Sequence, residues 1–105
     1  LYQSEIETSF SRSLERYVDF LKYLGLNPPF TWVAGMVGTR GRELGYADPP
    51  GQYFRSNRVP ICLTDLIEIE GTYDGVSTST AVLLPFFERI FEKCGLKRPD
   101  HLPQQ

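Results

Sequence analysis

The chain has 105 residues, which is the length of one small domain and too short for two independent cores. A hydrophobic fraction of 41%, a charged fraction of 23% and fourteen aromatic residues (seven Phe, six Tyr and one Trp) are typical of a folded globular protein and exclude disorder throughout. The net charge of −2 gives no electrostatic reason to expect nucleic-acid binding by the chain as a whole. The chain has no run of about 20 apolar residues and no secretory signal at its start, so we expect no membrane span and a cytoplasmic location.

Residues 4–24 have the spacing of an amphipathic helix. Apolar side chains recur at intervals of three and four residues, at Ile6, Phe10, Leu14, Tyr17, Leu21 and Leu24. Gly25 followed by Leu26 is a typical helix end, and the prolines at 28 and 29 prevent continuation. We expect this helix to pack on the sheet of its own domain.

Residues 30–37, FTWVAGMV, predict a strand. They are uncharged and rich in β-branched and aromatic residues, which favours a central strand covered on both faces. Gly35 predicts either a bulge or the close approach of another backbone. Residues 38–41 predict a turn, and residues 42–46 are expected to return as a hairpin partner.

The middle of the chain predicts a long loop and a second strand. Residues 47–57 contain prolines, glycine and serine, which is typical of a loop. Residues 59–69 predict the strand, with a slip in the apolar phase near Asp65 that indicates a bulge or a break. Residues 71–75 predict another turn.

A second amphipathic helix is expected before the end of the chain. Residues 77–80 offer four N-cap candidates, and the helix is expected to end near Cys94, before Gly95. Residues 96–105 predict a polar tail broken by prolines. The whole chain, residues 1–105, is therefore predicted as one α+β domain. Its small mixed or antiparallel sheet is covered by an N-terminal and a C-terminal amphipathic helix.

Four arginines in the central section are candidates for anion or nucleic-acid contact. They are Arg40, Arg42, Arg55 and Arg58. The glycine-rich turn at residues 38–42 lacks the Lys-Ser/Thr pair of a phosphate-binding loop, which argues against a nucleotide site there. Two interpretations stay open: solvated surface charge, or guanidinium contact with a phosphate backbone or a partner's carboxylate.

Three carboxylates in the second strand region resemble the acidic run of a metal-dependent nuclease. They are the weak metal-site candidates Asp65, Glu68 and Glu70. Glu68 and Glu70 occupy alternate strand positions and would share one face. No lysine lies beside them, however, and the solvent face of an edge strand is the simpler interpretation.

Cysteine and histidine are too few for a zinc site or a nucleophile with its base. Cys62 and Cys94 are predicted to be buried thiols, and His101 lies in the predicted tail. We therefore predict no catalytic residues, no metal and no cofactor.

Two segments together resemble a known family. Residues 21–44 read L-x-x-L-G-L-x-P-P-F-x-W-V-A-G-x-V-G-T-R-G-R-E-L, and residues 91–100 read F-E-K-C-G-L-K-R-P-D. This pattern resembles the segment that follows the Schlafen/AlbA-type domain in bacterial proteins described as ATP-binding proteins or transcriptional regulators. The resemblance spans most of the chain without an active-site motif. It implies the C-terminal domain of a longer protein, whose nucleotide- or nucleic-acid-related function belongs mostly to the remainder.

The leading functional prediction is a non-enzymatic accessory domain. It would mediate self-association as a homo-oligomer, or contact with the remainder of a longer parent chain. The alternative is a nucleic-acid-binding module that uses the four arginines. A divalent-metal nuclease that uses the three carboxylates is the third prediction.

Overall fold

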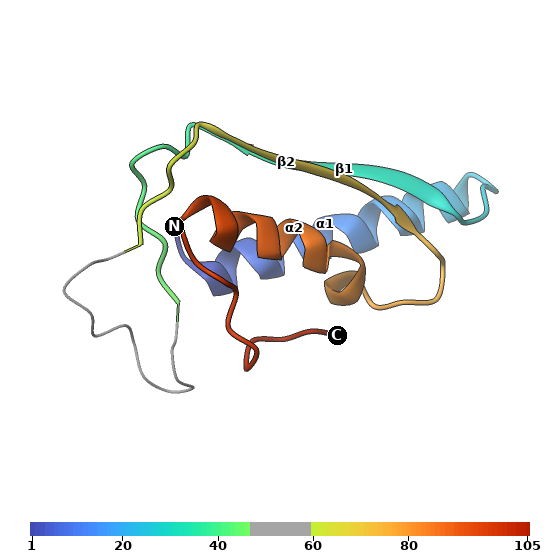
Figure 1. Cartoon of the computed structure of the whole chain (residues 1–105). Coiled ribbons are helices and arrows are strands. Elements are labelled where there is room, and N and C mark those ends of the chain that lie inside the picture. Colours follow the sequence, from blue (N-terminus) through green and yellow to red (C-terminus); the bar gives the residue numbers. More distant parts are fainter. Residues whose placement is uncertain (47–59) are drawn as a thin grey trace.

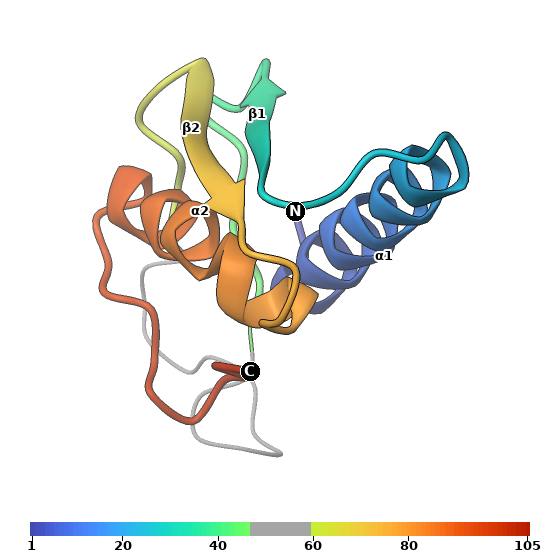
Figure 2. The same ribbon diagram turned by 90° about the vertical axis from the view of Figure 1, so that its right-hand side faces the viewer.

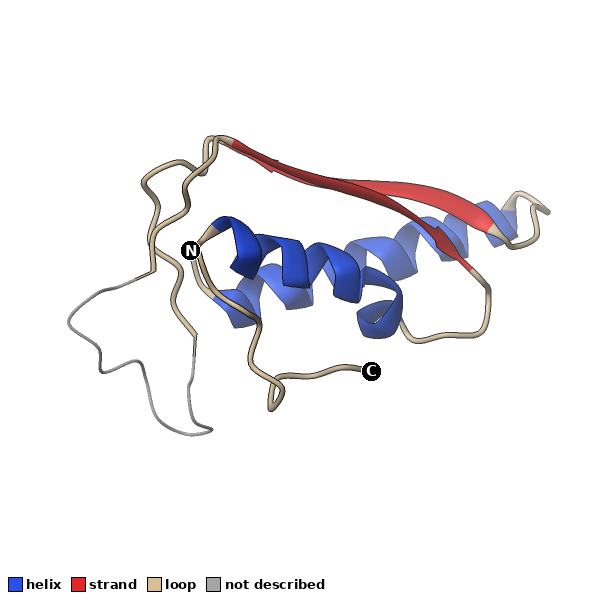
Figure 3. Cartoon of the chain, viewed as in Figure 1, coloured by secondary structure: helices blue, strands red, loops and turns tan. Residues whose placement is uncertain are grey.

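The fold of this chain, a computed structural model that describes residues 1–46 and 60–105, is a pair of strands over a pair of helices (Figure 1). In chain order the elements are α1 (Gln3–Tyr23), β1 (Phe30–Val37), β2 (Leu66–Tyr73) and α2 (Ser79–Lys93). Both helices lie on the same side of the antiparallel strand pair (Figure 3). Within this arrangement α2 packs on β2, and α1 packs on α2. The predicted α+β class is confirmed.

Both helices end as their glycines predict. Gly25 and Gly95 have positive φ angles of +85° and +77°, which favour glycine because it has no Cβ. The N–H of Leu26 donates to the carbonyl of Leu21, and the corresponding bond closes the end of α2, so both ends are Schellman turns. These caps stop each helix within a residue or two of the predicted position.

α2 begins a few residues before the first apolar residue of its buried face. Thr78 is the N-cap, and its hydroxyl accepts the N–H of Ala81 at 3.2 Å. Because the helix begins at Ser79, Pro85 lies inside it rather than in its first turn. The proline ring is exposed, and the residue lacks the N–H that would donate to the carbonyl of Ala81.

The strand pair has one unbroken register. Phe30 lies opposite Tyr73 and Val37 opposite Leu66, without a bulge. The close approach that Gly35 predicts is present instead, because a Cβ there would lie 3.3 Å from the carbonyl oxygen of Ile67.

One face of the sheet is open, which corrects the prediction that β1 is covered on both faces. Side chains alternate along β1, so that Ala34 is buried toward α2 while Val33 and Val37 on the outer face are 60% and 80% exposed. Both helices lie on the inner side of the sheet, but only α2 packs on it, whereas α1 packs mainly on α2 and not on the sheet as expected; the described residues place nothing on the outer face. The lack of charge in β1 therefore does not mark a central strand.

The pairing partner of β1 was predicted wrongly. Residues 42–46 make only isolated bridges, one between Glu43 and Ile61 and one between Gly45 and Tyr2. Their main-chain groups bond to the N-terminus and to residues 60–62 instead of to β1. The strand that pairs with β1 comes from later in the chain.

The bounds of the second strand also differ from the prediction. β2 begins at Leu66, so the phase slip at Asp65 marks its start rather than a bulge within it. β2 continues through residues 71–73, which were predicted as a turn. The predicted loop at residues 47–57 lies outside the described residues.

The core is built mainly by α2. Phe86, Phe87 and Phe91 are essentially inaccessible to solvent, and Ile67 and Leu44 pack with them. Among the described residues, no helix combines the length and the apolar character needed to cross a membrane.

Most of the C-terminal tail is exposed, as its polar, proline-broken sequence predicts, but two of its residues are buried. Arg98 is only 4% exposed, and Leu102 is 7% exposed. Two guanidinium nitrogens of Arg98 donate to the carboxylate of Glu7 in α1, at 2.6 and 3.0 Å, and one also donates to the carbonyl of Pro103 at 2.7 Å. The tail is thus fixed to the start of α1.

Asp74 organises the turn between β2 and α2, and this gives a pH prediction. Its carboxylate accepts the hydroxyl of Ser77 and the N–H groups of Ser77 and Val76, and these hydrogen bonds lower its pKa from 3.8 to about 2. Because the pKa of Asp74 is lower in the folded than in the unfolded state, its ionised carboxylate stabilises the fold at pH values above the unfolded-state pKa. This stabilisation is lost as the pH falls through about 2. Between about pH 4 and pH 2, the wild type should therefore lose more free energy of unfolding than Asp74→Asn, as measured by urea unfolding. Equal losses would contradict the assignment.

Candidate functional site

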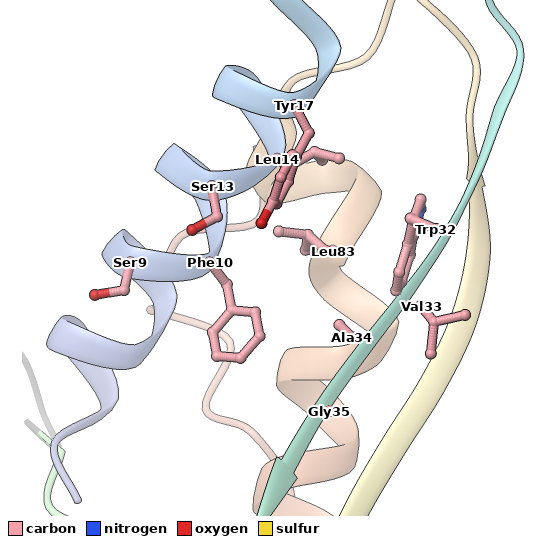
Figure 4. Close-up of a pocket in the computed structure, with 10 residues that line it drawn as sticks. All are labelled: Ser9, Phe10, Ser13, Leu14, Tyr17, Trp32, Val33, Ala34, Gly35 and Leu83. Atoms are coloured by element: carbon pink, nitrogen blue, oxygen red, sulfur yellow. The ribbon is translucent and has the colours of Figure 1, made fainter. Parts of the chain in front are cut away.

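A cavity of about 360 Å³ opens between α1 and β1 (Figure 4). We call it the β1–α1 groove, and its volume is within the usual range of ligand sites. It is lined by Ser9, Phe10, Ser13, Leu14, Tyr17, Trp32, Val33, Ala34, Gly35 and Leu83.

The groove exists because α1 leaves the core along its length. The N-terminal half of α1 is held on α2, where the rings of Phe10 and Phe86 lie 4.7 Å apart in a tilted pair. α1 packs on α2 rather than on β1, and seen end-on α1 and β1 open like a V (Figure 2). In this region α1 and the sheet are therefore not packed against each other.

The walls of the groove are apolar and its rim carries hydroxyl groups. Phe10 and Leu14 of α1, Leu83 of α2 and Trp32 of β1 supply the apolar surface, as Figure 4 shows. Among the described residues, no charged side chain lines it. Such a surface accepts uncharged side chains, because a charged group would lose hydration there without gaining a partner.

The edge of β1 that faces the groove has no strand beside it in the described part of the chain. An unpaired edge presents N–H and C=O groups in a row, and natural proteins usually protect such edges with charged side chains. β2 carries Glu68 and Glu70, whereas β1 carries no charged residue in eight positions. The unprotected edge of the sheet is therefore the one beside the groove.

Trp32 leaves one hydrogen-bonding group unsatisfied at the groove. Its ring lies across Gly71, where a Cβ would be only 2.5 Å from a ring carbon, so only glycine fits beneath the indole. Its Nε1–H is buried and has no acceptor among the described residues. An unpaired buried donor costs about 1–3 kcal/mol, and native structures contain few of them.

The projecting end of α1 continues the apolar surface beyond the groove. Its exposed large side chains are Tyr17, Phe20, Tyr23, Leu24 and Leu26, each at least half exposed. Tyr17 belongs to both surfaces because it also lines the groove. A contiguous exposed apolar surface of this kind is characteristic of interaction sites.

The predicted arginine site is only partly described. Arg40 is exposed, and its guanidinium lies 3.7 Å from the carboxylate of Asp65, with both side chains about two-thirds exposed. Arg42 is also exposed. Arg55 and Arg58 lie outside the described residues, so nucleic-acid contact through the four arginines stays a prediction. The Arg40–Asp65 pair contributes at most about 1 kcal/mol, as exposed ion pairs do.

The structure does not bring the three nuclease candidates together. Glu68 and Glu70 share the outer face of β2 as predicted, but Asp65 precedes the strand and pairs with Arg40. Within residues 1–46 and 60–105, no group of three or more His, Cys, Asp or Glu side chains is arranged to hold a metal ion.

Two serines in α1 are a sequence feature from which the groove could have been predicted. Ser9 and Ser13 lie one turn apart next to the apolar stripe of α1, so the side of the helix that faces the groove changes from apolar to polar there. A fully buried helix side seldom carries two such hydroxyl groups at this spacing.

Comparison of the chain with protein-family models, with curated proteins and with solved structures finds no match. We therefore infer function from the geometry of the groove and of the β1 edge.

Proposed function

We propose that this chain is an interaction domain that binds an extended segment of a protein partner as an additional strand along β1. The observation that carries the proposal is the uncharged, unpaired edge of β1 beside an apolar groove. Strand addition of this kind obtains affinity from main-chain hydrogen bonds and specificity from pockets for alternate side chains.

The two-layer packing supports this mode of binding. Two-stranded sheets are only marginally stable, and a third strand beside β1 would lie above α1 as β2 lies above α2. The added strand would cover the parts of Phe10 and Leu14 that face the groove. Binding would thereby complete a sheet of three strands over two helices.

The walls of the groove indicate the chemistry of the segment. Its inward-facing side chains should be uncharged and apolar, because the described residues that line the groove carry no charge. Its outward-facing side chains would lie beside Val33 and Gly35 on the open face, where polar groups are exposed to solvent. We therefore expect a segment that alternates apolar and polar residues.

The family resemblance suggests one source of the segment. Residues 21–44 and 91–100 resemble Schlafen/AlbA-type bacterial proteins, in which this region would be an accessory domain of a longer parent chain. The partner segment would then come from the remainder of that parent. Such a role requires no catalytic residues in this domain.

The proposal is tested with a displayed library of random eight-residue peptides, matched to the length of β1. Selected peptides should alternate apolar and polar residues. On binding, the unpaired N–H groups of β1 should gain protection from hydrogen exchange in NMR spectra. Peptides N-methylated at alternate residues should lose binding, because the methyl groups remove the main-chain donors of the added strand.

A charge on the edge of β1 should block binding. Val33→Lys places a lysine on the unpaired edge, where natural proteins use it against strand addition, and should weaken peptide binding at least about tenfold. The matched control is Leu66→Lys. Leu66 is on the same face with 52% exposure, against 60% for Val33, but it belongs to β2, and this variant should bind as the wild type does.

Two results would decide against the proposal. Equal weakening by Val33→Lys and Leu66→Lys would show binding to the open face rather than to the edge. Selected peptides that tolerate N-methylation at every position would show that no strand is added. Self-association in sedimentation that is lost in Val33→Lys would support strand addition and identify β1 of a second copy as the segment.

A further inference from the structure

Two thiols meet where the end of α2 contacts the chain that leads into β2. The Sγ atoms of Cys62 and Cys94 lie 2.7 Å apart, and neither residue is in a disulfide. The residues are 1% and 6% exposed, so the contact is inside the core. Sulfur atoms this close have no other atom between them.

Main-chain hydrogen bonds fix both cysteines in place. The N–H of Leu63, next to Cys62, donates to the carbonyl of Lys93, next to Cys94, at 2.9 Å. Cys62 itself donates to the carbonyl of Arg42 at 2.9 Å. Cys94 is the C-cap of α2 and donates to a carbonyl in the last turn of that helix. The two backbones are therefore paired side by side at the position of the thiols.

The environment keeps the Cys94 thiol protonated in the folded protein. Burial, together with the hydrogen bond to Cys62, raises the pKa of the Cys94 thiol to about 12. The thiolate is the reactive form, so oxidation in the closed structure is slow and requires a local opening or an unfolded chain. Because the two Sγ atoms are in contact in the fold, the bond that then forms joins Cys62 to Cys94.

We propose that Cys62 and Cys94 form an intrachain disulfide when the chain refolds or opens in the presence of a low-molecular-weight disulfide. One cysteine thiolate attacks a sulfur of oxidised glutathione and releases one glutathione thiolate, which leaves a mixed disulfide. The second cysteine thiolate attacks the protein sulfur of that mixed disulfide and releases the second glutathione. Overall two protein thiols are oxidised, one glutathione disulfide is reduced to two thiols, and the two protons pass to the released thiolates.

The bond would join residues that are 32 positions apart. It would connect the C-terminal end of α2 covalently to the segment before β2, which the fold otherwise holds through noncovalent contacts only. Restricting the unfolded chain in this way stabilises the folded state, and the effect increases with the length of the closed loop. Neither cysteine lines the β1–α1 groove, so this inference does not depend on the proposed function.

The test is refolding of the purified chain with a mixture of reduced and oxidised glutathione. We expect monomeric protein that has lost two hydrogen atoms by mass spectrometry, with a peptide map that links Cys62 to Cys94. The midpoint temperature of unfolding should rise by on the order of 10 °C relative to the reduced protein, and reduction should reverse this rise.

A matched control separates the disulfide from other effects of the oxidant. The variant Cys62→Ala/Cys94→Ala keeps small apolar side chains at both positions and should show no change in mass or in unfolding temperature. Refolded wild-type protein that carries glutathione on both cysteines, or that forms disulfide-linked dimers, would overturn the proposal. So would folded monomer that retains both free thiols.

Discussion

Arg98→Ala is expected to lower the free energy of unfolding by about 3–5 kcal/mol, because it leaves the carboxylate of Glu7 buried without its partner. The pair is almost removed from solvent, with side-chain exposures of 2% for Arg98 and 10% for Glu7. Its geometry is bidentate, with donor–acceptor distances of 2.6 and 3.0 Å. Urea unfolding followed by circular dichroism measures the loss.

Two further variants separate the pair from the general effect of removing an arginine. Arg89→Ala removes the half-exposed partner of Glu92, an ion pair one turn apart in α2, and should cost no more than about 1 kcal/mol. Glu7→Leu/Arg98→Met replaces both charges by apolar groups and should recover much of the loss, since no buried charge is left unpaired. A loss in Arg98→Ala as small as that in Arg89→Ala would show that the tail separates from α1 and hydrates Glu7 at little cost.

Phe86→Ala should also destabilise the domain by about 3–5 kcal/mol. Phe86 has no exposed surface, and its ring contacts those of Phe10 and Phe87, with centroid separations of 4.7 and 6.2 Å. Truncation leaves a cavity at the point where α1 is held on α2. The amides of α1 should therefore lose hydrogen-exchange protection more than those of the β1–β2 pair.

The control for this variant is Phe20→Ala on the same helix. Phe20 is 57% exposed on the projecting end of α1, so its removal should change the free energy of unfolding by less than about 0.5 kcal/mol. A uniform loss of protection over all four elements in Phe86→Ala would contradict a specific role in holding α1.

The sequence predicted most accurately those elements that local signals define. Gly25 and Gly95 end the two helices, and Thr78 was among the four predicted caps of α2. β1 has the predicted bounds because Pro29 and Gly38 lie on either side of eight apolar or small residues. In each case the controlling residues lie within a few positions of the boundary.

Strand pairing was not predicted correctly because it depends on contacts that local sequence does not report. Residues 42–46 follow a turn and have the composition of a hairpin partner. However, β1 pairs with β2, whose first residue, Leu66, lies opposite Val37. Gly71 suggested a turn, whereas its lack of a side chain is required beneath the ring of Trp32. That requirement is visible only once the two strands are paired.

The candidate site was missed for a related reason. An uncharged strand has the same composition whether it is buried on both faces or has an unprotected edge, so residues 30–37 alone did not distinguish the two. Likewise Arg98, between a lysine and a proline, had the local sequence of a solvated tail. Its partner Glu7 lies 91 positions away.

The strand register has a consequence for how quickly this chain folds. Every paired residue of β1 meets a residue far along the chain, from Phe30 with Tyr73 to Val37 with Leu66, and no tight hairpin brings the two strands together. A long segment must therefore lose its conformational freedom before the first strand contact forms. Folding rates fall as contacts become less local, so we expect the two capped helices to gain structure early and the sheet to form late, in milliseconds to seconds rather than microseconds.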